Sequence, residues 1–242
     1  MELTVLGCSG SYGSKDRGAC SGYLVRHDDV ALWLDCGNGS FPALQEHIDP
    51  ADLTGVVITH EHPDHCVDLY GLHVLLRYGL HQEHLPLWAP EGAERRLGAL
   101  VHDWDDTFVW NKLIDGTTAE VGPLALRFSR TDHPPPTFAV EIGAEGRRLV
   151  YTSDTGADWD VGVFGPGADV VLSEATYLHA DRPTPIHLSA RQAGEAARAA
   201  AARRLVLTHI WPGLDPAAIA AEGSEAFGAP VTIAEPHLTI EV

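Results

Sequence analysis

Three histidines and an aspartate follow one another closely in the segment Thr59-His60-Glu61-His62-Pro63-Asp64-His65. Imidazole nitrogen and carboxylate oxygen are ligands that borderline-soft divalent metals such as zinc take in proteins. In an extended loop, the alternating positions of His60 and His62 turn both rings toward the same side. The segment therefore predicts a metal site to which one loop supplies several ligands.

Other residues with metal-binding or acid–base chemistry follow short apolar segments that are rich in β-branched residues. These segments cover residues 56–60, 149–154, 170–174 and 205–209, and a fifth, 124–132, is followed by His133. In layered α/β proteins, residues just past the carboxyl ends of strands gather at one edge of a sheet. We therefore expect five distant segments to deliver polar groups to one place, which favours a built site over a solvated His-rich turn that binds metal adventitiously.

The elements that position these residues are short strands with helices between them. Further strands are expected at 3–6, 23–26, 30–34, 137–142 and 238–242, with a tight hairpin turn at 143–146. Helices are expected near 41–48, 66–78, 91–102, 190–202 and 216–227. Ser189 and Gln192 have capping-box spacing at the start of the fourth helix, and Arg203 and Arg204 would close its other end. This order predicts an α/β protein, an αββα sandwich of two mixed β-sheets with helices on the outer faces, in one domain over residues 1–242.

Composition and charge restrict the classes of partner that the protein is expected to bind. The chain has 242 residues, 45% hydrophobic and 21% charged, which is a globular composition. Its 34 acidic and 16 basic residues give a formal net charge of −18, a field that repels phosphate polymers, so an extended nucleic-acid partner is disfavoured. The apolar runs are too short for a membrane span and the start has no basic leader pattern, so we expect a cytoplasmic protein with no membrane partner. Cys8, Cys20, Cys36 and Cys66 lack CxxC spacing and are expected to be reduced.

The HxHxDH pattern after a strand resembles the metallo-β-lactamase fold superfamily, and the resemblance extends over essentially the whole chain. In that superfamily a further His, a bridging Asp and a last His follow in this order, and His133, Asp154 and His209 occupy the matching places. The resemblance implies two divalent transition-metal ions, with zinc expected and manganese or iron as alternatives. It implies that one ion is bound by His60, His62 and His133, the other by Asp64, His65 and His209, and both by Asp154, while Asp64 also counts among the catalytic residues.

Some of these residues also have simpler interpretations. A lone His133 at a strand end could be a hydrogen-bonded loop residue, although the stiff Pro134-Pro135-Pro136 run after it could fix its ring. Asp35, after the strand at 30–34, could hydrogen-bond the His-rich loop or cap the turn at 37–39, and the sequence supports both roles equally.

Two further segments, Ser173-Glu174-Ala175-Thr176 and His187-Leu188-Ser189, resemble the Glu-Ala-Thr element and the proton-donating His of ribonuclease Z and its relatives. Two metals can clamp a phosphoryl oxygen, but a leaving alkoxide still needs a proton. The resemblance implies that His187 donates this proton and that Glu174 hydrogen-bonds its ring and keeps it charged. The alternative is a His that merely precedes a helix and a Glu that merely caps one.

Ribonuclease Z carries a Gly/Pro-rich arm that grips transfer RNA, inserted between the ligands that match His133 and Asp154. Only 20 residues separate these two here, which leaves no room for an arm. The chain is more similar to small, arm-less bacterial relatives described as atypical cyclic-nucleotide phosphodiesterases, which share its opening Leu-Thr-Val-Leu-Gly-Cys-Ser-Gly and its Leu-Thr-His-Ile-Trp-Pro segment.

We therefore expect a metal-dependent hydrolase that converts a small phosphodiester, with a 3′,5′-cyclic nucleotide as the expected substrate, to a monoester. The alternatives are a ribonuclease Z-like RNA 3′-processing nuclease, a lactone or thioester hydrolase of the same fold, and a metal-binding protein without turnover. Trp211, two residues after His209, is expected to lie near the metals and to contact a base, whereas Trp104, Phe108 and Trp110 are expected to pack in the core. The oligomeric state stays open, with a homodimer among the possibilities.

Overall fold

The computed structural model describes residues 1–101, 103–181 and 184–242, which fold into two seven-stranded sheets. The first sheet contains, in spatial order, β14 (Thr239–Glu241), β1 (Glu2–Gly7), β2 (Gly22–His27), β3 (Val30–Leu34), β4 (Gly55–Val57), β5 (Leu85–Pro90) and β6 (Phe108–Leu113). The second contains β13 (Thr232–Ile233), β12 (Leu205–Thr208), β11 (Val170–Glu174), β10 (Arg147–Tyr151), β9 (Phe138–Ala144), β8 (Leu124–Arg130) and β7 (Thr118–Val121).

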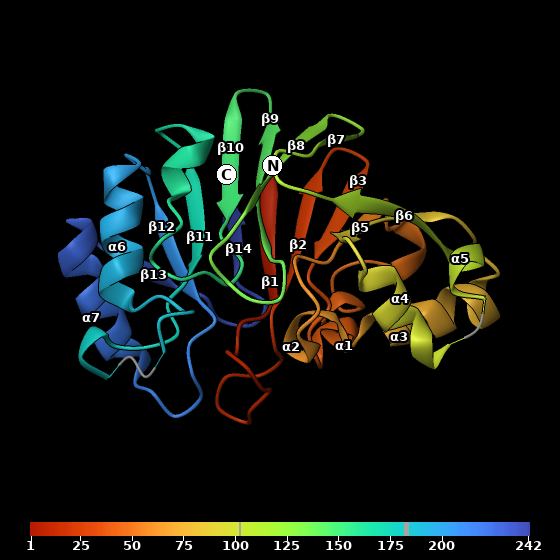
Figure 1. The fold of residues 1–242 in the computed structure, drawn as a ribbon, viewed down its shortest axis with the longest axis horizontal. Helices are drawn as coiled ribbons and strands as arrows, with labels where there is room; N and C mark the ends of the chain where they lie inside the picture. The colour runs from red at the N-terminus through yellow and green to blue at the C-terminus, as the bar shows by residue number, and fades with distance from the viewer. Residues whose placement is uncertain (102, 182–183) are drawn as a thin grey trace.

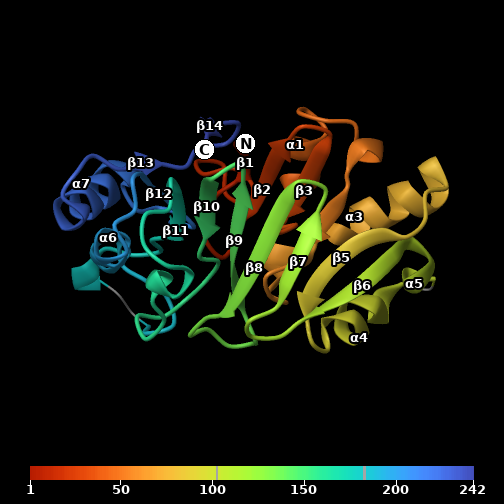
Figure 2. The same ribbon diagram turned by 90° about the horizontal axis from the view of Figure 1, so that it is seen from above.

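Helices lie outside the paired sheets. They are α1 (Ser40–Leu44), α2 (Pro63–Cys66), α3 (Leu69–Val74), α4 (Ala93–Leu97), α5 (Trp104–Thr107), α6 (Ala190–Ala199) and α7 (Pro216–Phe227). Figure 2 shows the two sheets face to face, with α6 and α7 beside β11–β13 at one end and α3, α4 and α5 beside β5 and β6 at the other. The predicted αββα sandwich is confirmed.

Three apolar layers hold the sandwich together. The middle layer lies between the sheets and includes Leu3, Tyr23, Val140 and Leu172. The layer under α1 and α3 is built around Trp33, and the layer under α6 and α7 consists largely of small side chains. Each fully buried Val, Leu or Phe contributes about 1.5–3 kcal/mol, so these layers dominate the stability of the fold. The four cysteines are free and buried within it.

Parallel strands bring distant segments to a common edge. Strands β3, β4, β5 and β6 pair in parallel in the first sheet, as do β10, β11, β12 and β13 in the second. Strand β8 points the same way as β10, because both pair antiparallel with β9. The carboxyl ends therefore meet at one edge of the sandwich, where Figure 1 shows α2 and the loop after β1.

The helices differ in part from expectation. The helix expected at 190–202 forms as α6 with the capping box of Ser189 and Gln192, but it ends at Ala199. Arg203 therefore does not close it, and pairs with Asp169 at 2.8 Å. The helix expected at 66–78 divides into α2, α3 and a π-helical segment, Leu75–Leu80. The one expected at 91–102 forms as α4 followed by a 3-10 turn, Gly98–Leu100, and residue 102 lies outside the described residues.

Candidate metal centre

Strained backbone marks the edge where the strands end. Asp35, Ser153 and His209 follow β3, β10 and β12, and all three have left-handed φ values of 54°, 53° and 55°. Residues other than Gly rarely adopt such φ values, and the few that do cluster at functional sites. Gly37 adds a close approach, because a Cβ there would lie 2.1 Å from the Asp64 carbonyl oxygen. The local backbone is thus shaped to aim polar side chains at one point.

Three imidazoles converge to form the first of two groups of polar side chains at this edge. His62 Nδ1 lies 3.1 Å from His60 Nε2 and 3.2 Å from His133 Nε2. Asp154 Oδ2 lies 3.6 Å from His60 Nε2 and 3.8 Å from His133 Nε2. Zn–N bonds of about 2.0–2.1 Å in a tetrahedron separate ligand atoms by about 3.3–3.4 Å, so these four atoms fit a metal of that size.

A second group lies on the other side of Asp154. His65 Nε2 is 3.6 Å from Asp64 Oδ2 and 3.4 Å from Asp154 Oδ1, and His209 Nε2 is 3.3 Å and 3.6 Å from the same two oxygens. The two oxygens of Asp154 therefore face the two groups separately. This is the arrangement that a bridging carboxylate requires, and it brings together all seven residues of the expected ligand set.

Orphaned polar atoms indicate what the cluster is built to hold. Within the described part of the chain, His65 Nε2 and Asp154 Oδ1 are buried and have no hydrogen-bond partner. A buried polar atom without a partner costs about 1–3 kcal/mol, and a cation between the two atoms would remove that penalty. The donor set, imidazole nitrogen with two carboxylates, suits zinc and its neighbours. The residues present thus fit divalent metal ions.

A fully buried carboxylate holds the His-rich loop in place. Asp35 accepts hydrogen bonds from His65 Nδ1 at 2.7 Å and from the Thr59 amide and hydroxyl at 2.8 and 2.9 Å. The Tyr151 hydroxyl, from the other sheet, donates to it at 2.8 Å. Of the two roles left open for Asp35, hydrogen bonding to the loop is confirmed. Its bond to Nδ1 leaves His65 Nε2 directed at the cluster.

Other histidines of the cluster are oriented in the same way. His133 Nδ1 lies 2.9 Å from the Ile186 carbonyl oxygen, and His209 Nδ1 lies 2.9 Å from Thr176 Oγ1. His60 Nδ1 lies 3.1 Å from Thr59 Oγ1. In each ring the other nitrogen then faces the cluster, which is the orientation a metal ligand needs.

The pKa values of the cluster shift in opposite directions, and the carboxylates of Asp154, Asp35 and Asp64 outweigh burial and raise the pKa of His65 well above its ordinary value. Burial, reinforced by His65, lowers the pKa of His60 well below its ordinary value, and burial also lowers that of His62. Burial alone would raise the pKa of Asp154, but His209 and His65 hold it well below its usual range. Neutral imidazole and ionised carboxylate are the forms that bind metals.

His187 and Glu174 form a pair beside the cluster. His187 Nδ1 donates to Glu174, with distances of 3.1 and 3.2 Å to the two oxygens, and lies 3.9 Å from Asp154 Oδ2. Burial lowers the pKa of His187, but the Glu174 carboxylate outweighs it and raises the pKa to about 9. Glu174 is held by the Thr155 amide and the Thr176 hydroxyl. The expected bond between the two side chains is therefore present, and the imidazole carries a proton at neutral pH.

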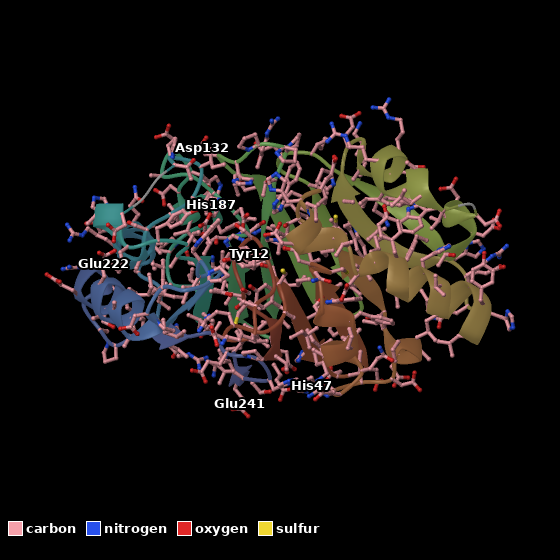
Figure 3. The ribbon with its side chains drawn as sticks, turned by 90° about the horizontal axis from the view of Figure 1, so that it is seen from below. Tyr12, His47, Asp132, His187, Glu222 and Glu241 are labelled. Atoms are coloured by element: carbon pink, nitrogen blue, oxygen red, sulfur yellow. The ribbon has the colours of Figure 1, made fainter. Side chains whose placement is uncertain are left out.

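An aromatic cluster of Tyr12, Tyr177 and Trp211 adjoins this pair. Trp211 lies 5.7 Å from both tyrosine rings, and Tyr177 lies 6.3 Å from His187. Figure 3, viewed from the side of the site, shows Tyr12 and His187 near the middle of this face. The expected place of Trp211 near the site is confirmed. Trp104 and Phe108 are buried together in the core, as expected.

Sequence reasoning missed the loop after β1. The Ser11 amide donates to His209 Nε2 at 3.4 Å, and Tyr12 extends the aromatic cluster. Neither residue has metal-ligand chemistry, so spacing gave no signal. A left-handed Ser11, with φ of 64°, is the structural sign that this loop is shaped for the site.

Comparison with known proteins places this geometry in a family. The model of the family described as "Beta-lactamase superfamily domain" matches residues 31–210. The chain belongs to this superfamily. The crystal structure of the metallo-β-lactamase fold protein YhfI from Bacillus subtilis superposes with a TM-score of 0.90 at 26% identity, covering 100% of this chain and 98% of that one. The chain is thus a metal-dependent hydrolase of the metallo-β-lactamase fold.

Sequence relatives point to the ribonuclease Z-like branch of the superfamily. The uncharacterized protein ML1173 of Mycobacterium leprae is 38% identical over 243 residues, 96% of this chain and 85% of its own. A ribonuclease Z of Natronomonas pharaonis is 25% identical over 303 aligned residues, covering 100% of this chain and 98% of its own. A diphosphatase of the PhnP family shares the fold, with a TM-score of 0.81 at 21% identity, covering 100% of this chain and 97% of that one.

Two structural observations bear on partners. Residues 134–153, all described, are occupied by a short loop, β9, its turn and β10, so no protruding arm separates His133 from Asp154. The turn has left-handed Glu145 and Gly146, which confirms the predicted hairpin. Among the described helices, none is long and apolar enough to cross a membrane.

Proposed function

We infer that this hydrolase is a dinuclear metal-dependent phosphodiesterase that converts a small phosphodiester, with a 3′,5′-cyclic nucleotide as the substrate, to a monoester. The observation that carries this proposal is the His187–Glu174 pair, placed 3.9 Å from the carboxylate of Asp154. An alkoxide is a poor leaving group, and a protonated imidazole beside the site supplies what it lacks. The ligand cluster alone would serve many reactions of this fold.

The metals would be held by the two groups of side chains that face the oxygens of Asp154. His60, His62 and His133 would bind one ion, and Asp64, His65 and His209 the other. Divalent ions supply Lewis acidity that polarises a phosphoryl oxygen and lowers the pKa of water. Zinc is the proposed metal. The chain's own contribution is to fix the ligands through Asp35, Thr176 and the Ile186 carbonyl.

His187 would hold and deliver the proton that the leaving oxygen needs. Its Nδ1–H is committed to Glu174, so Nε2 is the nitrogen from which the proton is transferred. With a pKa near 9, the ring is protonated at neutral pH, and its side chain is 10% exposed, enough to contact a substrate. Glu174 also receives the Thr176 hydroxyl, which in turn contacts His209, so one carboxylate orients both the donor and a ligand.

Two features support a small substrate: the shortage of cationic surface and the presence of the aromatic cluster. A long RNA requires many phosphate contacts from cationic surface, whereas the chain has a net charge of −18 and no arm in residues 134–153. A cyclic nucleotide needs one phosphate site and a surface for its base. Trp211 and the half-exposed Tyr12 offer such a surface, and a base stacked on an aromatic ring gains about 1–3 kcal/mol.

A ribonuclease Z-like 3′-processing nuclease is the second candidate. It is favoured by the ribonuclease Z relative, whose alignment covers the whole chain. That alignment spans 303 positions against 242 residues here, so at least 303 − 242 = 61 of its positions have no counterpart in this chain. A lactone or thioester hydrolase is a weaker candidate, because its leaving group has less need of the Glu174–His187 pair.

The test is a panel of substrates offered to protein loaded with zinc, manganese or iron. We expect turnover of 3′,5′-cyclic nucleotides and of bis(4-nitrophenyl) phosphate, and no hydrolysis of the lactones and thioesters in the panel. Turnover confined to lactones or thioesters would refute the phosphodiesterase proposal.

A further inference from the structure

A pocket opens beside the ligand cluster at His62, and none of the residues of the aromatic cluster lines it. It has a volume of about 480 Å³ and begins at the ring of His62. Its walls come from the segment of α2 and α3 and from the segment of α4 and the 3-10 turn after it. The apolar residues that line it are Pro63, Val67, Tyr70, Leu97, Leu100 and Pro135.

The pocket adjoins the candidate site, and two of its lining residues belong to segments that supply metal ligands. His62 lies in its wall, and Pro135 follows the ligand His133 by two residues. The His133 ring lies 5.1 Å from His62 and 4.9 Å from the proposed donor His187. A phosphorus substituent held near His62 would therefore lie across His133 from the donor.

A hydrogen bond joins the two walls of the pocket. The Tyr70 hydroxyl donates to the Leu97 carbonyl oxygen at 2.7 Å and ties α3 to α4. The Tyr70 ring packs 5.4 Å from Trp104 in the core. A preformed pocket of this size, mostly apolar with few polar groups, is the usual form of a small-molecule subsite.

The charges at its rim cancel. Arg96 Nη1 lies 2.5 Å from Glu61 Oε2, with the Arg side chain 62% exposed and the Glu side chain 7% exposed. This pair adds no net charge to the pocket, while Leu100 stands 78% exposed at its mouth. An uncharged apolar group would gain contact with Leu100, Leu97 and Pro135 without displacing an ion pair.

We propose that this pocket is the subsite for an aromatic group that stays on the phosphate when the enzyme hydrolyses an acyclic diester. The inference rests on the proposed function. In such a step water supplies the new P–O bond and the P–O bond to the leaving group near His187 breaks. The leaving oxygen takes the proton of His187, and a proton from the water restores the imidazolium. The aromatic group remains on the phosphate of the product.

The first test is binding, which needs no turnover. Phenylphosphonate resembles the product with its retained ring, and methylphosphonate is the matched probe without it. By calorimetry on metal-loaded protein, we expect the phenyl compound to bind at least about tenfold more tightly, because its ring leaves water. Leu100→Asp places a charge at the mouth and should abolish this preference. Val163→Asp is the control, since Val163 is also an exposed apolar residue, 54% exposed, outside the pocket lining.

Equal binding of the two phosphonates to the wild-type protein would overturn the proposal. So would a phenyl preference that survives Leu100→Asp and disappears in Trp211→Ala, because the ring would then rest on the aromatic cluster. The second test compares phenyl 4-nitrophenyl phosphate with methyl 4-nitrophenyl phosphate, which share a leaving group. We expect kcat/KM to favour the phenyl ester by about tenfold and Leu100→Asp to remove the difference. Absence of hydrolysis of every diester would refute the proposed function, while the phosphonate result would still decide the subsite.

Discussion

Two carboxylate–histidine pairs lie at the same edge of the sandwich, one in each sheet, and they are built alike. Asp35 follows β3 and accepts from His65, while Glu174 ends β11 and accepts from His187. Both carboxylates are fully buried. Asp35 also accepts from the backbone amide of Thr59 at 2.8 Å, and Glu174 accepts from the amides of Thr155 and Leu188 at 2.6 and 3.1 Å.

The pairs differ in what surrounds the ring. His65 is fully buried, and its Nε2 lies within 3.6 Å of both Asp64 and Asp154. His187 reaches the surface, stacks on His209 at 5.3 Å, and adjoins the aromatic cluster. The same hydrogen bond thus orients a ligand in one sheet and holds a transferable proton in the other. The neighbouring carboxylates raise the pKa of both rings, so the difference lies in their place: His65 Nε2 faces Asp64 and Asp154 in the ligand cluster, whereas the His187 ring lies beside the cluster and is 10% exposed.

Asp154 contacts both pairs, so its loss should have the largest effect. In Asp154→Ala both groups of ligands lose a carboxylate oxygen. Loss of a residue that only supports a ligand typically lowers metal affinity by about 10–100-fold, and we expect a larger fall here, with activity abolished. Elemental analysis of the purified variant measures this. His84→Ala, which changes an exposed histidine outside the cluster, should keep its metal. Undisturbed metal content in the Asp154 variant would contradict the ligand assignment.

Removal of the His187 ring should separate chemistry from metal binding. His187→Ala is expected to retain its metal and to lose about 10² to 10⁴ in kcat on a cyclic nucleotide, the usual cost of losing a general acid. A nitrophenolate leaves without a proton, so the loss on bis(4-nitrophenyl) phosphate should be smaller. Equal losses on the two substrates would rule out proton donation by this residue.

The Asp35 pair should show the opposite pattern. Asp35→Asn keeps the size of the side chain but removes the charge that His65 Nδ1 faces. We expect metal affinity to fall by about 10–100-fold, and activity to recover when excess metal is added. Titration with a competing chelator measures the affinity. If added metal restored nothing and metal affinity were normal, Asp35 would not act through the ligand loop.

The smallest effect at neutral pH is expected for Glu174→Gln, and it should appear mainly in the pH profile. Because Glu174 raises the pKa of His187 to about 9, the protonated donor persists up to that pH and is lost above it. Without the carboxylate the pKa falls, so the alkaline limb of kcat should move to lower pH. An unchanged limb in the variant would show that another group sets it.

Much of this site could be predicted because its residue types, His, Asp and Glu, are themselves typical of metal binding and acid–base chemistry. Histidines and acids after β-branched runs indicate ligands at strand ends, and the parallel strands then bring them together. Ser189 and Gln192 gave the start of α6 because a capping box is local. Arg203 was misplaced because its partner, Asp169, is set by tertiary packing.

What could not be predicted depends on contacts between distant segments. Strands β5 and β6 do not show the apolar β-branched pattern, because β5 contains Pro86 and Pro90 and β6 contains Asn111 and Lys112; they are defined by their pairing with each other. The Ile186 carbonyl that orients His133 has no sequence signal, because any residue carries one. The pocket at His62 likewise arises from packing of α3 against α4 and has no motif.

The most direct measurement sets a 3′,5′-cyclic nucleotide against a precursor transfer RNA, with metal-loaded protein at matched concentration and near-physiological salt. With a net charge of −18 and no arm between His133 and Asp154, the protein should hydrolyse the cyclic nucleotide and leave the RNA largely uncut. Efficient cleavage of the RNA at its 3′ trailer, with the cyclic nucleotide intact, would contradict the account and favour the nuclease.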